Sequence, residues 1–150
     1  MKEIMNQNVV VGKINQTIYE IAEMMKKYDI GFLPIAKGNK IVGVITDRDI
    51  VIGPILNQIE GSTSIENYIT HRVISIDINA SIDDLLECMT TYQIKRILIT
   101  DQNKIVGVIS IRDLVAHNIN SQKLIDTLKQ IDCIKAYPNQ SDLEIDEFYL

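Results

Sequence analysis

Apolar and polar positions follow two different periods along the chain, and the same succession of periods occurs twice. The β-branched runs at residues 9–11 and 73–74 are typical of short strands. After each run, apolar residues recur at the three- and four-residue spacing of one helix face. Thr17 and Ser81 precede these patterns and are favourable N-caps. The predicted faces consist of Ile18, Ile21, Ala22, Met25 and Tyr28 in the first half and Ile82, Leu85, Leu86 and Met89 in the second.

Two further strands, joined by a polar turn typical of hairpins, follow each predicted helix. A second helix comes after them, so each half has the order strand, helix, strand, strand, helix. The second and third strands are expected at 32–35 and 41–45 in the first half, and at 97–99 and 105–109 in the second. The turns occupy 37–40 and 101–104, and the second helices begin at Arg48 and Arg112.

The two halves are copies of each other at a shift of 64 residues: residues 5–52 align with 69–116 without a gap, and 19 of 48 pairs are identical. One copy of roughly 50 residues buries too little surface to be stable alone. We therefore predict a mixed α/β (α+β) fold of two β-α-β-β-α repeats packed about a pseudo-two-fold axis. The predicted parts are repeat 1 (1–60), repeat 2 (61–118) and a C-terminal helix with an acidic tail (119–150), with a short helix capped by Ser64 in the joining segment.

The motif that ends each third strand resembles that of the CBS domain family in its tandem form, the Bateman module. It consists of Gly, an apolar pair, Ser or Thr, two variable residues, Asp and an apolar residue, and it stands at 43–50 and 107–114. The second strands, at 30–35 and 94–99, also fit the family, and the resemblance covers about residues 4–118.

The chain departs from the family pattern at its prolines. The proline of the second strand is present as Pro34 but replaced by Leu98, and the proline after the first strand is replaced by Ile14 and Ile78. Pro34 itself is interpreted as a strand-edge residue rather than a functional one.

The resemblance implies a ligand-sensing module that binds an adenine nucleotide, such as AMP, ADP or ATP, between the repeats. The Asp accepts hydrogen bonds from the ribose hydroxyls, and the Ser or Thr meets a phosphate at a helix N-terminus. β-branched side chains form the walls around adenine. Carried over, cleft A uses Val44, Thr46, Arg48 and Asp49 with Thr70, Val73, Ile74, Ile94, Lys95 and Arg96. Cleft B uses Val108, Ser110, Arg112 and Asp113 with Val9, Val10, Ile30, Gly31 and Phe32.

These residues have simpler interpretations as well. Asp49 and Asp113 can be first-turn helix acids that the helix dipole stabilises. Lys95 and Arg96, which make cleft A the predicted phosphate site, can be an ordinary solvated pair. Arg48 and Arg112 can pair with acids across a subunit interface, and a structural or interaction protein with empty clefts is the alternative function.

Charge and composition narrow the partners. The formal net charge of −5, with no Trp and 5% aromatic residues, is unfavourable for nucleic acid. His71 and His117 are isolated, so no metal site is expected, and Cys88 with Cys133 is typical of reduced thiols in a cytoplasmic protein. No signal peptide, apolar run of about 20 residues or P-loop is present, so we expect neither a membrane span nor an enzyme.

The C-terminal part adds two expectations. A helical pattern runs through residues 119–131, and the tail beyond Pro138 alternates acids with apolar residues, which is typical either of disorder or of a docking segment. Apolar residues of the second helices indicate a homodimer, with a protein partner left unidentified. These residues are Ile50, Val51, Leu114 and Val115.

Overall fold

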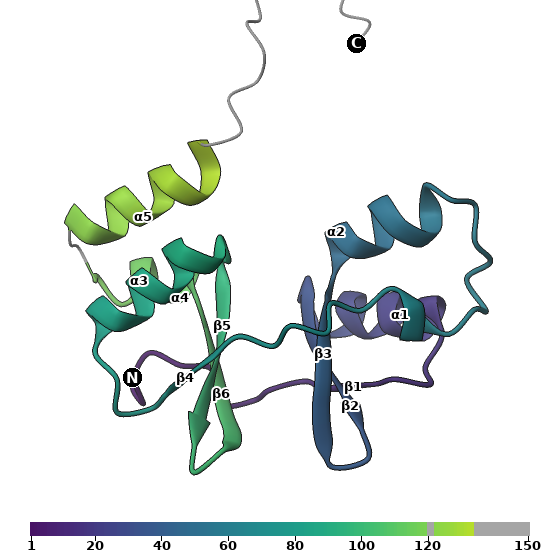
Figure 1. The fold of residues 1–150 in the computed structure, drawn as a ribbon, viewed down its shortest axis with the longest axis horizontal. Coiled ribbons are helices and arrows are strands. Elements are labelled where there is room, and N and C mark those ends of the chain that lie inside the picture. Colours follow the sequence, from purple (N-terminus) through teal and green to yellow (C-terminus); the bar gives the residue numbers. More distant parts are fainter. Residues whose placement is uncertain (120–121, 134–150) are drawn as a thin grey trace, which may run out of the picture.

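Two three-stranded sheets, one in each repeat, form the frame of the structure, a computed structural model that describes residues 1–119 and 122–133 (Figure 1). Repeat 1 contains β1 (Gly12–Lys13), β2 (Phe32–Lys37) and β3 (Lys40–Thr46), and repeat 2 contains β4 (Ser75–Asp77), β5 (Arg96–Asp101) and β6 (Lys104–Ser110). In each sheet the first strand is parallel to the central second strand, which pairs with the third in an antiparallel hairpin. The mixed fold of two repeats is therefore confirmed.

Two long helices begin where the sequence predicts them. They are α1 (Ile18–Tyr28) and α3 (Ile82–Tyr92), capped by Thr17 and Ser81. Each cap is a reciprocal box, in which the backbone N–H of Thr17 donates to Glu20 (2.7 Å) and that of Ser81 donates to Asp84 (3.1 Å). These bonds lower the pKa of Glu20, mainly through the Thr17 backbone N–H, and the pKa of Asp84, mainly through the Ser81 hydroxyl.

Each repeat has its own apolar core between its sheet and its helices. Ile21, Leu33 and Ile45 are fully buried in the first core, and Leu86, Ile97 and Ile109 are fully buried in the second. Within the predicted helix faces, Ala22 and Tyr28 are exposed instead of buried. They lie at the margin of the α1 face, which Ile18, Ile21 and Met25 already fill.

Pro34 and Leu98 occupy equivalent positions in β2 and β5, the central strands of the two sheets. Side chains alternate across a strand, so these two point away from the cores formed by their neighbours, yet both are buried. Pro34 stands in a central strand, so its interpretation as a strand-edge residue is wrong. Its missing N–H leaves no gap in the hairpin, because the opposite residue, Val44, bonds outward to Thr70.

Two segments cross from one repeat to the other (Figure 1). Asn6 forms an antiparallel bridge with Val108 of β6, with N–H···O distances of 2.9 and 3.0 Å, before the chain crosses to β1. Thr70 forms the same bridge with Val44 of β3, with distances of 2.8 and 2.9 Å, before the chain crosses to β4. The start of each repeat is thus paired with the other repeat.

The crossing explains why the family motif begins with glycine. A Cβ at Gly43 would lie 2.8 Å from the Thr70 carbonyl oxygen, and a Cβ at Gly107 would lie 3.2 Å from that of Asn6. It also explains why Ile65 and Ile69 belong to the core of repeat 1, although the sequence divides the repeats at residues 60 and 61.

The first strands differ from the prediction. Residues 9–11 and 73–74 are not strands, and β1 and β4 begin at Gly12 and Ser75, because only from there does the chain run beside β2 and β5. The β-branched runs form the crossing segments, where no strand lies beside them over their whole length.

The second helices are shorter than α1 and α3. α2 (Asp47–Ile50) continues as the π-helical turn η1 (Val51–Ile55), in which Pro54 removes one backbone donor. α4 (Ile111–Ala116) is its counterpart in repeat 2. The predicted short helix of the joining segment is the 3₁₀ turn η2 (Ile65–Asn67), with Ser64 as its cap.

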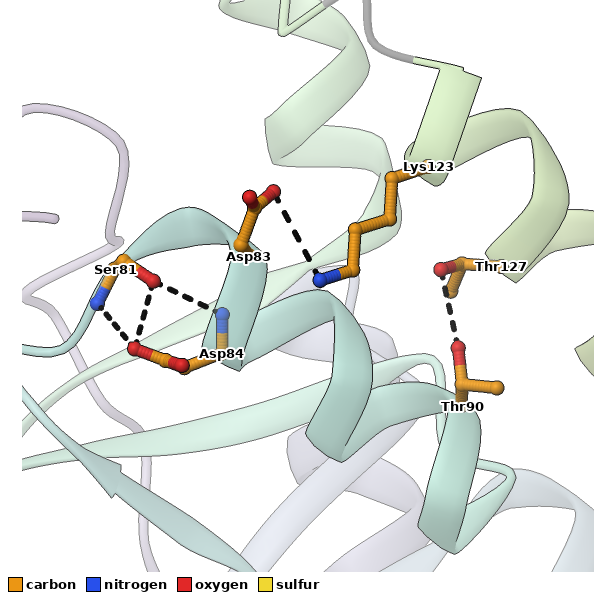
Figure 2. A network of polar contacts seen from close by, with 6 residues as sticks. All are labelled: Ser81, Asp83, Asp84, Thr90, Lys123 and Thr127. Atoms are coloured by element: carbon orange, nitrogen blue, oxygen red, sulfur yellow. Dashed lines mark hydrogen bonds and ion pairs between the residues drawn. The ribbon is translucent and has the colours of Figure 1, made fainter.

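The C-terminal helix α5 (Gln122–Cys133) lies on α3. Leu124 joins the core of repeat 2, and the Thr90 hydroxyl donates to that of Thr127 at 3.0 Å, where Thr127 is 2% exposed (Figure 2). Lys123 Nζ lies 4.0 Å from Asp83 Oδ1, an exposed pair that adds little stability. The predicted acidic tail lies outside the described residues. Within the described ranges, no helix has the length and apolar character needed to cross a membrane.

Candidate functional site

The two repeats share the same order of strands and helices, and in each repeat the third strand leads directly into a helix. We call residues 46–49 junction 1 and residues 110–113 junction 2. At junction 1 the carboxylate Oδ2 of Asp49 accepts the backbone N–H of Thr46 (2.9 Å) and its hydroxyl (2.7 Å). The Thr46 hydroxyl in turn accepts the Asp49 N–H at 3.2 Å. Threonine and aspartate at this spacing therefore form a capping box for α2.

Junction 2 repeats the arrangement with serine. Asp113 Oδ2 accepts the Ser110 N–H at 2.7 Å and the Ser110 hydroxyl at 2.5 Å, and the hydroxyl accepts the Asp113 N–H at 3.3 Å. Asp113 and Asp49 are both half-buried.

The interpretation of Asp49 and Asp113 as first-turn helix acids is thus confirmed. The capping bonds use only one of the two oxygen atoms of each carboxylate. Each uses Oδ2 for the cap, and Oδ1 accepts no hydrogen bond from any described residue. An ionised carboxylate has about four lone-pair positions, so Oδ1 retains acceptor capacity. The ribose role stays a prediction.

Four of the β-branched residues predicted to form the adenine walls lie on the crossing segments. Val9, Val10, Val73 and Ile74 are all half-buried. The peptide groups of Val10 and Val73 make no hydrogen bond to a described residue. In repeat 2 the carbonyl of Ile74 accepts the N–H of Leu98 at 3.4 Å, but in repeat 1 Pro34 has no N–H to offer the equivalent carbonyl of Val10.

Strand register divides the remaining site residues between the two repeats. Across the hairpins, Phe32 pairs with Thr46, and Arg96 pairs with Ser110. The backbone of Arg96 therefore lies beside junction 2 in its own repeat, and its place in a cleft with Thr46 and Asp49 of the other repeat stays a prediction.

The same division holds one residue earlier. The N–H of Asp47 donates to the Gly31 carbonyl at 3.2 Å, and the N–H of Ile111 donates to the Lys95 carbonyl at 3.0 Å. Ile30 and Ile94 are half-buried and pack against the cores of their own repeats.

Arg48 and Arg112 are exposed, and neither forms an ion pair with a described residue. Lys95 and Arg96 are exposed as well. The side chains of all four cations near the junctions are therefore exposed.

Sequence reasoning left two residues out of the predicted clefts. Asp47 was passed over as a variable position, yet its carboxylate lies against Gly31, where an added Cβ would be 2.5 Å from Oδ2. Asn6 was passed over at the N-terminus, although the shift of 64 residues makes it the counterpart of Thr70.

Other chemistry is accounted for elsewhere. The part of the chain that the structure describes contains no group of three or more His, Cys, Asp or Glu residues able to hold a metal ion. His71 Nδ1 lies 3.3 Å from the Val42 carbonyl oxygen, and partial burial raises the pKa of the free thiol of Cys88. Hollows of about 170 Å³ between α3 and α5 and about 410 Å³ beside residues 13–15 lie away from the junctions.

Comparisons with known proteins show which family has this sequence and this fold. The model of the CBS domain matches residues 1–53 and 65–119. The CBS domain-containing protein YhcV of Bacillus subtilis (strain 168) is 30% identical over 131 residues, which are 87% of this chain and 94% of that protein. The structure of Hypoxic Response Protein I with two coordinated zinc ions has a TM-score of 0.68 at 30% identity, over 77% of this chain and 96% of that chain. The CBS domain pair of protein MJ0100, in complex with 5′-methylthioadenosine and S-adenosyl-L-methionine, has a TM-score of 0.69 at 26% identity, over 79% and 98%.

Proposed function

The chain belongs to the CBS domain family as a tandem pair, and from this premise we propose that it binds an adenine nucleotide or a related adenosine derivative at its two junctions. CBS pairs are ligand-binding regulatory modules, so the role proposed is regulatory and non-enzymatic. Ligand binding would control either a protein partner or the assembly of the chain itself.

The observation that carries the proposal is the free acceptor at each junction. Oδ1 of Asp49 and Oδ1 of Asp113 are left over from the capping boxes, in half-buried positions fixed by three hydrogen bonds each. A ribose presents two vicinal hydroxyl donors, and charge-assisted hydrogen bonds to a carboxylate are the strong ones. The capping boxes of α1 and α3 hold Glu20 and Asp84 by the same bonds, but those two carboxylates are exposed, whereas Asp49 and Asp113 are half-buried.

The crossing segments support the adenine part of the proposal. Val10 and Val73 combine half-buried aliphatic side chains with peptide groups that no described residue engages. An adenine ring needs apolar walls together with donors and acceptors for its edge, and these residues offer both. The complex of the MJ0100 pair with 5′-methylthioadenosine and S-adenosyl-L-methionine is a related pair holding ligands of this chemical class.

Assembly is the second part of the proposal, and an apolar surface on repeat 1 supports it. Four residues at the end of α2 and beyond are between 50% and 71% exposed, namely Val51, Ile52, Ile55 and Leu56. Of the residues expected at such a surface, Val51 and Val115 are exposed, whereas Ile50 and Leu114 belong to the cores. We propose a homodimer through this α2–η1 surface. The same surface favours the second candidate function, a purely structural protein with empty junctions.

A thermal-shift screen of the full chain with adenosine, 5′-methylthioadenosine, AMP, ATP and the guanosine counterparts tests the proposal. A ligand that binds only the folded state raises the midpoint as its concentration rises above its Kd. We expect the adenosine compounds to raise it and the guanosine compounds to have no effect. A midpoint that no adenosine compound moves at millimolar concentration would favour the structural role.

A further inference from the structure

Taken together with the strand starts beside them, the two junctions carry opposite charge, although their capping boxes are the same. Asp47, Arg48 and Asp49 give junction 1 a formal charge of −1. At junction 2 the position of Asp47 is taken by Ile111, and the strand-start positions occupied by Gly31 and Phe32 in repeat 1 are taken by cations. Counted without Lys95, junction 2 and its strand start hold Arg96, Arg112 and Asp113, a formal charge of +1.

Asp47 is held in place at the first turn of α2. Its Oδ1 accepts the N–H of Arg48 at 2.8 Å, and its own N–H donates to the Gly31 carbonyl at 3.2 Å. Its Oδ2 lies over the Cα of Gly31, in space that any side chain at position 31 would need. Glycine at 31 and aspartate at 47 therefore form a matched pair that fixes a negative charge at the start of β2.

Junction 2 has the same backbone bonds with the charge removed. Ile111 donates its N–H to the Lys95 carbonyl, and its side chain is 8% exposed within the core of repeat 2. Lys95 and Arg96 occupy the strand start, where Arg96 pairs with Ser110. The difference between the junctions is thus electrostatic, on a common backbone.

We propose that Asp47 makes junction 1 selective for adenosine derivatives without a phosphate, neutral or cationic at the 5′ position, and that junction 2 takes the phosphate-bearing nucleotides. This inference rests on the proposed function. A carboxylate one residue from the Thr46 cap repels a phosphate held there, and a surface charge pair at such range changes affinity by roughly 3- to 10-fold.

The experiment compares two ligands that differ only at the 5′ position, 5′-methylthioadenosine and AMP. Calorimetry is performed on the Asp113→Ala chain, in which junction 1 remains intact. We expect this chain to bind 5′-methylthioadenosine more tightly than AMP. Adding Asp47→Asn should raise AMP affinity by roughly 3- to 10-fold and leave 5′-methylthioadenosine within about twofold, and the gain should shrink at high salt.

Glu23→Gln is the matched control, because it removes an exposed acid of the same repeat on α1. It should change neither affinity. Equal changes for both ligands with Asp47→Asn, or no change for AMP, would overturn the selectivity while leaving the proposed function intact. Absence of binding of every adenosine ligand to the unmodified chain would instead remove the proposed function, and the inference with it.

Discussion

Asp49 has two roles in this account, since it caps α2 and binds ribose, and substitution can separate them. Asp49→Ala removes the acceptor of the Thr46 N–H and hydroxyl. Loss of a capping interaction costs about 0.5–2 kcal/mol of stability, which lowers the melting temperature of a domain of this size by about 2–8 °C. Loss of a charge-assisted bond to ribose costs a further 1.5–3 kcal/mol of binding energy at junction 1, about 10- to 150-fold in Kd.

Asp84→Ala is the control for the first of these effects. Asp84 accepts the Ser81 N–H and hydroxyl in the same box, at 3.1 and 2.7 Å, but at the start of α3 (Figure 2). It should therefore lower the melting temperature by a similar amount without changing Kd. Urea unfolding and calorimetry with 5′-methylthioadenosine, in the Asp113→Ala background, measure the two quantities. Equal loss of affinity in the Asp49→Ala and Asp84→Ala chains would refute a ribose role, because the cap alone would explain it.

Three further outcomes follow from the fold. Thr127→Val should cost about 1 kcal/mol in urea unfolding, because it leaves the half-buried Thr90 hydroxyl unpaired; if the Thr90→Val/Thr127→Val chain is no more stable than Thr127→Val, that bond is not the cause. The pKa values of Glu20 and Asp84 are lower in the folded chain than in the unfolded chain, so both carboxylates stabilise the fold when the pH is above their unfolded pKa values. This stabilisation is lost as the pH falls below about 4, and Glu20→Gln should therefore make the free energy of unfolding depend less on pH in the acid range. Leu56→Glu should convert a dimer of the 17.0 kDa chain to a monomer in light scattering, and a wild-type monomer at micromolar concentration would contradict the α2–η1 interface.

Much of the fold could be predicted from the sequence, because the helix starts and the hairpins depend on residues that lie close together in the chain. Thr17 and Ser81 begin their helices where the capping pattern places them, and the hairpins between the second and third strands stand where their polar turns predict. The crossing of the segment before β1 and of the segment before β4 between the two repeats could not be predicted in this way. Val10 and Val73 have the composition of strand residues, but only the long-range bridges at Asn6 and Thr70 decide that their segments cross between the sheets.

The site shows the same limit. The duplicated motif locates Asp49 and Asp113 at helix starts, and the structure places both there. Which residues of the other repeat accompany each acid depends on long-range contacts such as the bridges at Asn6 and Thr70, and the pattern within one repeat does not determine these contacts. The burial of Thr127 could not be predicted from the hydrophobic pattern either, since it depends on the hydroxyl of Thr90, which lies 37 positions earlier in the chain.

The most direct test of ligand binding at the junctions is an amide NMR titration of the isotope-labelled full chain with 5′-methylthioadenosine and AMP. The account predicts saturable shifts of the amides of residues 46–49 and 110–113 and of Val10 and Val73, with the α3–α5 hollow around Thr90 unaffected. Shifts confined to that hollow, or no shifts with either ligand at millimolar concentration, would contradict it.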